Sequence, residues 1–398
     1  MTTQSEARVG STVFVSDSRT RAVALGRSLA AGPHQAAARA ILAPFDSVAY
    51  VYASLDAMAS DDERALRSRH ARENLLKAGA SDQVASALAA RLIAASRPAA
   101  TLAAFVRADG TLLHEQVITG AELADDIGLL CPAPVLPLLE WGQDRPPFLL
   151  VVTDRAGADI TASPGAGQQE QTYCVVGPDD EIERRHGPGG WSQPSYQHRV
   201  EDSWRHNAAR VAHDVTTRAA AVGAQVLVLS GDVRAVQLLS DRLPDDPAVL
   251  VKHISGSRAA DGSQASRESR LDAVLREAAD AQTARLLDAL QEHLEPGGLA
   301  VEGVEDTVAA LANGRVATLL VQASAGDIRT AWFGAGPTEI YPDHDAAVQA
   351  GVPVRQGHLV DVATRSALLA GAHVRVIPQG APGEPANGMG AICRYRAP

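Results

Sequence analysis

The spacing of hydrophobic residues along the chain predicts an α/β protein whose strands and helices fall into three successive groups. The first group is expected to contain a strand, two helices and a hairpin, at residues 47–57, 62–78, 81–96 and 101–118. Ser81 has the position and side chain of a helix N-cap, and Asp109-Gly110 is a preferred turn pair for the hairpin. A proline-rich stretch at 131–147 ends this group.

The second group begins with five apolar residues in a row at 148–152, which indicates a strand buried on both faces. Further strands are expected at 158–163, 172–177, 224–232 and 248–255, and helices at 233–243 and 267–294. Between residues 196 and 222, apolar residues recur at steps of three and four, which predicts one helix of about 27 residues with a single apolar stripe. The alternation of strands and helices indicates a mixed or parallel sheet.

The third group follows the turn EPGG at 295–298. Helices are expected at 301–314 and 361–370, and strands at 316–323, 327–334, 373–378 and 388–395. We therefore predict an N-terminal domain over residues 1–145, a middle domain over 146–295 and a C-terminal domain over 296–398. The length of 398 residues also favours two or three domains.

Composition and charge narrow the possible functions. The net charge of −11 argues against a protein that coats nucleic acid along its whole surface, although a local basic patch is compatible with it. The three cysteines lie far apart, which suggests neither a zinc site nor a disulfide framework. The first residues lack a signal pattern and no apolar run approaches 18 residues, so we expect a cytoplasmic protein that does not bind membranes.

Motifs of conventional enzymes are missing from the sequence. There is no phosphate loop, no GxGxxG after a strand, no GxSxG and no HExxH, so no cofactor or resident metal is expected. Asp343-His344-Asp345 resembles a set of metal ligands, but a helix N-terminus with capping acids explains it better. Three strand-end carboxylates are candidates for the metal site of a nuclease, and turn positions are the alternative interpretation: Asp154, Asp159 and Asp232.

One segment, residues 183–196, combines glycines, prolines and arginines in an unusual way. Residues 187–194 contain three glycines and two prolines, which predicts a projecting loop whose bare backbone approaches a partner closely. Residues 182–218 contain six arginines and four acids, a local charge of +2. Arg199, His206 and Arg210 share one side of the following helix, whereas His213 is expected to be an ordinary surface residue. A flexible linker before a solvated helix face is the alternative.

The ordered set DRPPFLLVVTDRAGADI, GGWSQPSYQHRVED, AQVLVLSGD and VEGVEDTVAALANGRVATLLV resembles the archaeo-eukaryotic release factor and Pelota superfamily. The likeness is greatest to its bacterial branch, which includes ribosome hibernation factors of the Balon type, and it covers about residues 148–398. It implies a three-domain, tRNA-shaped α/β protein that occupies the ribosomal A site. The middle domain would be RNase H-like, and the C-terminal domain would be an α/β/α fold similar to kink-turn-binding ribosomal proteins.

The resemblance also implies what each domain contacts. The N-terminal domain would face the decoding centre, the loop of the middle domain would face the peptidyl-transferase centre, and the C-terminal domain would contact a translational GTPase such as EF-Tu. The expected rRNA-binding residues are Arg184, Arg185, Gly189, Gly190, Trp191, Ser192, Gln193, Arg199, Arg205 and Arg210.

The Gly-Gly-Gln tip of release factors corresponds to residues 189–193, but Trp191 and Ser192 separate the glycines from Gln193. A misplacement of about 1 Å at a reacting group can reduce the rate about 100-fold, so the insertion disfavours hydrolysis of peptidyl-tRNA. The stop-codon signatures of true release factors are absent from residues 1–140. The leading hypothesis is therefore a hibernation factor of idle or stalled ribosomes, such as those of starved cells. The alternative is a rescue factor in which Gln193 is catalytic.

The arginines before the loop generate a first prediction. The planar guanidinium of Arg binds phosphate oxygens in a bidentate manner, so the double substitution of Arg184 and Arg185 by Ala should weaken ribosome binding. The salt slope of binding should fall by about one unit for each lost phosphate contact. Binding constants at several salt concentrations test this, and an unchanged slope would place the RNA-binding face elsewhere.

Substitution of Trp191 by Ala gives a second variant for the same ribosome-binding assay. We expect its indole to stack on a nucleobase, an interaction of about 1–3 kcal/mol. The alternative is a hydrophobic staple beside Tyr196. Substitution by Ala that lowers the melting temperature and leaves affinity unchanged would support the staple.

Overall fold

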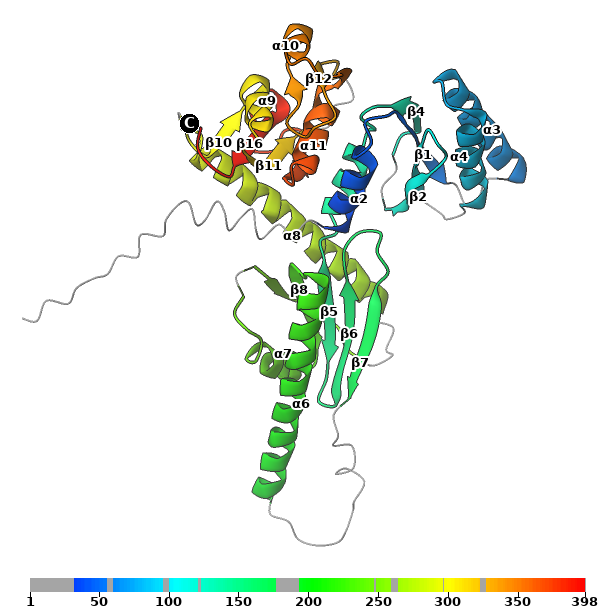
Figure 1. Ribbon diagram of the computed structural model, residues 1–398. Helices are drawn as coiled ribbons and strands as arrows, with labels where there is room; N and C mark the ends of the chain where they lie inside the picture. The colour runs from blue at the N-terminus through cyan, green and yellow to red at the C-terminus, as the bar shows by residue number, and fades with distance from the viewer. Residues whose placement is uncertain are drawn as a thin grey trace, which may run out of the picture.

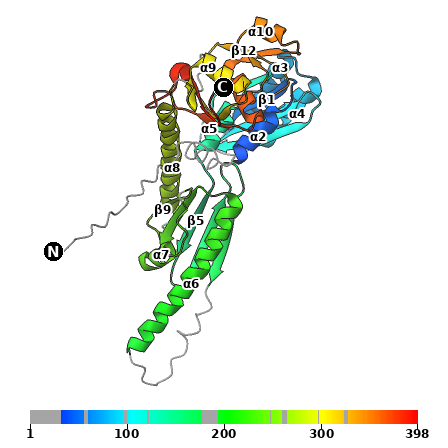
Figure 2. The same cartoon turned by 60° about the vertical axis from the view of Figure 1, so that its left-hand side comes forward.

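The computed structural model describes residues 32–55, 60–95, 100–120, 123–176, 193–246, 248–258, 264–295, 297–322 and 327–397, with only the backbone of 193–203. These residues form four β-sheets with helices packed against them (Figures 1 and 2). The α/β class predicted from the sequence is confirmed. The predicted domain boundaries stay predictions, and we describe the chain as an N-terminal unit (α2 to α5), a middle unit (β5 to α8) and a C-terminal unit (β10 to β16).

The N-terminal unit is an antiparallel sheet of order β3-β2-β1-β4, covered on one face by α3 and α4 and on the other by α2 and α5. Its elements are α2 (Pro33–Leu42), β1 (Val48–Leu55), α3 (Asp61–Lys77), α4 (Asp82–Ala94), β2 (Ala100–Arg107), β3 (Leu112–Thr119), β4 (Asp126–Leu130) and α5 (Leu136–Gln143). The predicted hairpin is confirmed, with Gly110 at φ +87° in its turn. Ser81 caps α4 by accepting a hydrogen bond from the Val84 N–H.

The middle unit is a mixed sheet of order β7-β6-β5-β8-β9, the RNase H-like arrangement that the resemblance implied. Its elements are β5 (Phe148–Thr153), β6 (Gly157–Ser163), β7 (Gln171–Val176), α6 (Gln193–Val222), β8 (Val226–Gly231), α7 (Val233–Ser240), β9 (Leu250–His253) and α8 (Gln264–Glu292). Leu149 and Val151 of β5 pack with α6, whereas Phe148 and Leu150 face α8. Burial on both faces explains the uninterrupted apolar run of this strand.

The C-terminal unit contains two sheets, of order β10-β16-β11-β15 and β13-β12-β14. Its elements are β10 (Ala300–Glu302), α9 (Val304–Ala312), β11 (Val316–Val321), β12 (Thr330–Phe333), β13 (Ile340–Tyr341), α10 (His344–Gln349), β14 (Arg355–His358), α11 (Leu359–Leu369), β15 (His373–Val376), the 3-10 turn η2 (Ala386–Gly388) and β16 (Met389–Cys393).

The helix expected at residues 301–314 begins later, at Val304, so this prediction was wrong at its start. Ala300–Glu302 pairs with β16, and Gly303, with φ +84°, separates the strand from the helix. Asp343 caps α10 by accepting a hydrogen bond from the Ala346 N–H. The capping interpretation of Asp343-His344-Asp345 is therefore confirmed.

The N-terminal and C-terminal units share one hydrophobic core, although more than 150 residues separate them in the chain. At their junction, two glutamine side chains complete the hydrogen bonding of the edge strand β15. Gln35 of α2 donates to the Val374 carbonyl (2.8 Å) and accepts from the Val374 N–H (3.2 Å). Gln143 of α5 does the same at Val376, at 2.8 and 3.0 Å.

Arg365 of α11 strengthens this junction from inside the core. It is 1% exposed and donates to the carbonyl of Leu42 at the end of α2 and to the carbonyls of Gly334 and Ala335. These bonds give a buried guanidinium several acceptors without a carboxylate partner, and burial lowers its pKa.

Helix α8 joins the middle unit to the C-terminal unit (Figure 1). Leu275 and Ala278 pack in the core beneath β5, whereas Leu286 and Leu290 pack against the C-terminal sheet. Arg375 of β15 is buried and donates to Thr283 Oγ1 and to the Ala279 carbonyl of this helix. One continuous helix therefore contributes to two cores.

Asp361, at the start of α11, generates a prediction about pH. It is 8% exposed, and desolvation, assisted by the negative charge of Asp126, raises its pKa to about 7. The native state therefore binds this proton up to about pH 7, whereas the unfolded chain releases it near pH 4. The contribution of Asp361 to the free energy of unfolding should decrease as the pH rises from about 4 to about 7.

Substitution of Asp361 by Asn should remove this contribution and make the protein more stable than the wild type at pH 8. Melting curves at pH 5, 6, 7 and 8 for the wild type, the Asp361→Asn variant and the exposed-site control Asp288→Asn test it. A stability difference between Asp361→Asn and wild type that does not change with pH would contradict the prediction.

Candidate RNA-contacting face of the middle unit

Helix α6 projects beyond the sheet of the middle unit (Figures 1 and 2). It has 30 residues, and the side chain of Asn207 fixes it to the turn between β5 and β6. Residues 193–206 precede Asn207 and correspond to about 21 Å of helix at 1.5 Å per residue. The structure places Gln193 as the first residue of this helix and Arg199 six residues later. Of the predicted site residues, six lie outside the described part of the chain: Arg184, Arg185, Gly189, Gly190, Trp191 and Ser192.

Asn207 fixes the base of the projecting segment. Its side chain is 6% exposed, and its Nδ2 donates to the Arg155 carbonyl in the turn between β5 and β6, at 3.1 Å. Ala208, Val211 and Val215 follow on the same stripe and pack on the sheet, as the apolar spacing predicted. The helix is therefore held by the sheet from Asn207 onwards.

Arg205 and Arg210 are both exposed on α6. Five residues correspond to a rotation of about 140°, so the two guanidinium groups lie on opposite edges of the solvent-facing side of the helix. His206 and His213 lie between these edges and are exposed, which confirms the expectation that His213 is a surface residue. The helix thus presents positive charge along two edges rather than one cluster.

Two further arginines at the base of α6 were missed by the sequence reasoning. The guanidinium carbon of Arg234, near the start of α7, lies 5.3 Å from the ring centre of Trp204. Arg155 lies in the turn that Asn207 contacts. Only the packing of α6 against α7 and this turn brings them near Arg205, since 50 residues separate Arg155 from Arg205 in the chain.

The three carboxylates considered as a nuclease site have other roles in the structure. Arg258 binds Asp159 in a bidentate manner, at 2.9 Å for both contacts, and also contacts Asp154 at 3.2 Å. The hydrogen bonds from Arg258 lower the pKa of Asp159. Asp154 also accepts the N–H groups of Ala156 and Gly157, and Asp232 caps α7.

The turn interpretation is confirmed for Asp154, whereas Asp232 caps a helix and Asp159 lies within β6, so this interpretation was wrong for Asp159. Within the described ranges, no group of three His, Cys, Asp or Glu residues is arranged to hold a metal ion. Across the same ranges, no helix combines the length and apolar character needed to span a bilayer.

The middle unit therefore combines an RNase H-like sheet with a projecting helix that carries exposed arginines. The resemblance to the bacterial branch of the archaeo-eukaryotic release factor and Pelota superfamily, which the sequence motifs indicated, is confirmed for the middle unit. Residues 147–295 match the model of bacterial archaeo-eukaryotic release factor family 2. The narrower resemblance to Balon-type factors stays a prediction.

Comparison with known proteins finds relatives over most of the chain. "Uncharacterized protein Rv2629" of Mycobacterium tuberculosis (strain ATCC 25618 / H37Rv) is 29% identical over 367 residues, which cover 89% of this chain and 94% of the relative. Among solved structures, Saccharomyces cerevisiae Dom34 is 11% identical, with 75% and 80% of the two chains covered and a TM-score of 0.39. Archaeal Pelota in a ribosome-bound model with ABCE1 is 14% identical, with 92% and 94% covered and a TM-score of 0.40.

The anchoring role of Asn207 generates a prediction about stability. Substitution by Ala removes the hydrogen bond to Arg155 but also removes the buried Asn207 Oδ1, which has no partner among the described residues. The net loss in free energy of unfolding should therefore be about 1 kcal/mol. Denaturant unfolding measures it, with His213→Ala on the same helix as the control. Equal stability of Asn207→Ala and His213→Ala would contradict the anchoring role.

Proposed function

We propose that this protein is a ribosome-binding translation factor that occupies the A site of idle or stalled ribosomes as a hibernation factor. The observation that carries the proposal is the projection of α6 beyond an RNase H-like sheet that matches the release factor family, with exposed Arg205 at the base of the projection and exposed Arg210 just past Asn207. A narrow projection with exposed arginines at its base is suited to a confined site whose walls carry phosphates.

The arrangement of the three units supports a division of roles. The shared core makes the N-terminal and C-terminal units one body, and α8 connects this body to the middle unit. In the proposed complex the middle unit extends toward the peptidyl-transferase centre. The N-terminal unit faces the decoding centre, and the C-terminal unit contacts a translational GTPase, for which EF-Tu is the proposed bacterial partner.

A rescue factor that hydrolyses peptidyl-tRNA is the second candidate, and one observation favours it. Gln193 is the first residue of α6, so its backbone N–H is among the four that the helix itself cannot satisfy. Such N–H groups stabilise developing oxyanions, and loss of one donor typically costs about 100- to 1,000-fold in rate. The two residues inserted between Gly190 and Gln193 are the reason why we place this function second.

Ribosome affinity tests the leading proposal. The double variant Arg205→Ala/Arg210→Ala should bind purified ribosomes at least tenfold more weakly than the wild type, with a salt slope about 1.5–2 units smaller. The matched control is Arg69→Ala/Arg285→Ala, which removes two exposed arginines from α3 and α8. Equal affinities and slopes for the two double variants would refute an RNA-binding role for α6.

Peptide release from stalled ribosomes distinguishes the two functions. A hibernation factor should release no more peptide than buffer does. Release that Gln193→Ala abolishes and Gln197→Ala, one turn along the same helix, preserves would instead establish the rescue function.

A further inference from the structure

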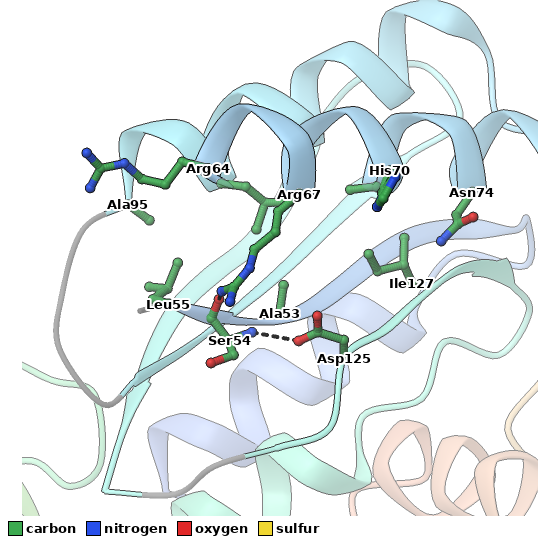
Figure 3. Close-up of a pocket in the computed structure, with 12 residues that line it drawn as sticks. Ala53, Ser54, Leu55, Arg64, Arg67, His70, Asn74, Ala95, Asp125 and Ile127 are labelled. Carbon is green, nitrogen blue, oxygen red and sulfur yellow. Dashed lines mark hydrogen bonds between the residues drawn. The ribbon is translucent and has the colours of Figure 1, made fainter. Parts of the chain in front are cut away.

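A hollow of about 250 Å³ lies in the N-terminal unit, between α3 and the sheet (Figure 3). Apolar side chains from three elements contribute to its lining, namely Ala53 and Leu55 of β1, Ile127 of β4 and Leu92 of α4. Leu55 and Leu92 are each 6% exposed, so neighbouring core side chains hold both of them in place. The hollow thus has a fixed apolar surface.

Polar side chains of α3 line the opposite side of the hollow. Ser68, Ala71 and Leu75 form the buried stripe of the helix, and the next positions around the helix on one flank carry Arg67, His70 and Asn74. Figure 3 shows Arg67 reaching from α3 toward the end of β1, with Arg64 on one side and His70 and Asn74 on the other. Arg67 therefore faces the apolar side of the hollow, whereas the Arg64 guanidinium points away from Arg67 (Figure 3).

The two arginines of the hollow, Arg64 and Arg67, are each held by a contact within the protein. Arg67 Nη1 donates to the Ser54 carbonyl at 2.9 Å, which uses one of the five N–H donors of the guanidinium. Arg64 contacts the exposed carboxylate of Asp61, an exposed ion pair that an incoming anion can replace at low cost. Asp125, the acid that lines the hollow, accepts the Ser54 N–H at 2.8 Å.

We propose that this hollow binds a single nucleotide, with its ring on the apolar surface beside Arg67 and its phosphate at Arg67, to which Arg64 can turn from Asp61. Isolated nucleobases are bound in proteins by stacking on guanidinium or aromatic planes and by hydrogen bonds to their edges. Asn74 offers both a donor and acceptor, and Asp125 offers an acceptor, for those edges.

The size and charge of the hollow exclude other ligands. Its volume lies below the 300–1,000 Å³ or so that is usual for small-molecule sites, so it suits one nucleotide and not a dinucleotide. Two arginines and a histidine against one carboxylate disfavour a divalent cation. An acidic peptide would satisfy the arginines but would leave the apolar surface uncovered.

Binding of 5′-mononucleotides to the full-length protein, measured by calorimetry, tests the proposal. At least one of AMP, GMP, CMP and UMP should bind, and its nucleoside and inorganic phosphate should each bind at least tenfold more weakly. Arg67→Ala should weaken nucleotide binding at least tenfold, as should His70→Ala, which serves if Arg67→Ala does not fold. Arg69→Ala, on the same helix but outside the hollow, should bind as the wild type does.

Absence of nucleotide binding, equal binding by Arg67→Ala and Arg69→Ala, or equally tight binding of phosphoserine would overturn the proposal. A single-stranded hexaribonucleotide identifies the source of the ligand. Tighter binding of the hexamer indicates a nucleotide of an RNA chain, and equal or weaker binding indicates a free nucleotide; both uphold the site. The assay contains no ribosomes, so its result is independent of the proposed function, and Arg205→Ala/Arg210→Ala should bind nucleotide normally.

Discussion

The closed edge of β15 is the constraint on which the arrangement of this protein depends. A sheet edge that is buried without hydrogen-bond partners is costly, because each unpaired backbone group loses its bond to water. Gln35 and Gln143 provide those partners from the N-terminal unit, one at Val374 and one at Val376. The apolar side chains around them then merge into one core, so the N-terminal and C-terminal units form a single body.

Stability and the candidate function occupy opposite parts of the molecule. The buried arginines Arg365 and Arg375 link helices and strands within the body and at its contact with α8. The exposed Arg205 and Arg210 lie on α6, near the end of the middle unit that projects away from that body (Figure 1). Arg205 and Arg210 therefore present their charges to solvent, while Val211 and Val215 of the same helix pack in the core of the middle unit.

The charge distribution is compatible with the RNA binding that we propose. The net charge of −11 is that of the whole chain, whereas three acids at the base of the candidate face are engaged locally. Arg258 pairs with Asp154 and Asp159, and Asp232 caps a helix. Neutralised carboxylates repel phosphates less, so a modest number of arginines is sufficient for a local positive potential.

The sequence by itself determined the elements whose causes are local. The apolar run of β5, the long stripe of α6, the Ser81 cap and the turn at Asp109-Gly110 depend on residues close together in the chain, and each is found in the structure. The ordered motifs also indicated the family whose model matches residues 147–295. Three features depended on tertiary structure, because their partners are distant in the chain. Ala300–Glu302 is a strand only because β16 lies beside it, and its three residues carry too little periodicity to signal this. Gln35 and Gln143 meet β15 more than 200 residues away, and Arg155 and Arg234 reach the base of α6 only through packing. A pattern along the chain records which side of an element is apolar, but not which distant surface will cover it.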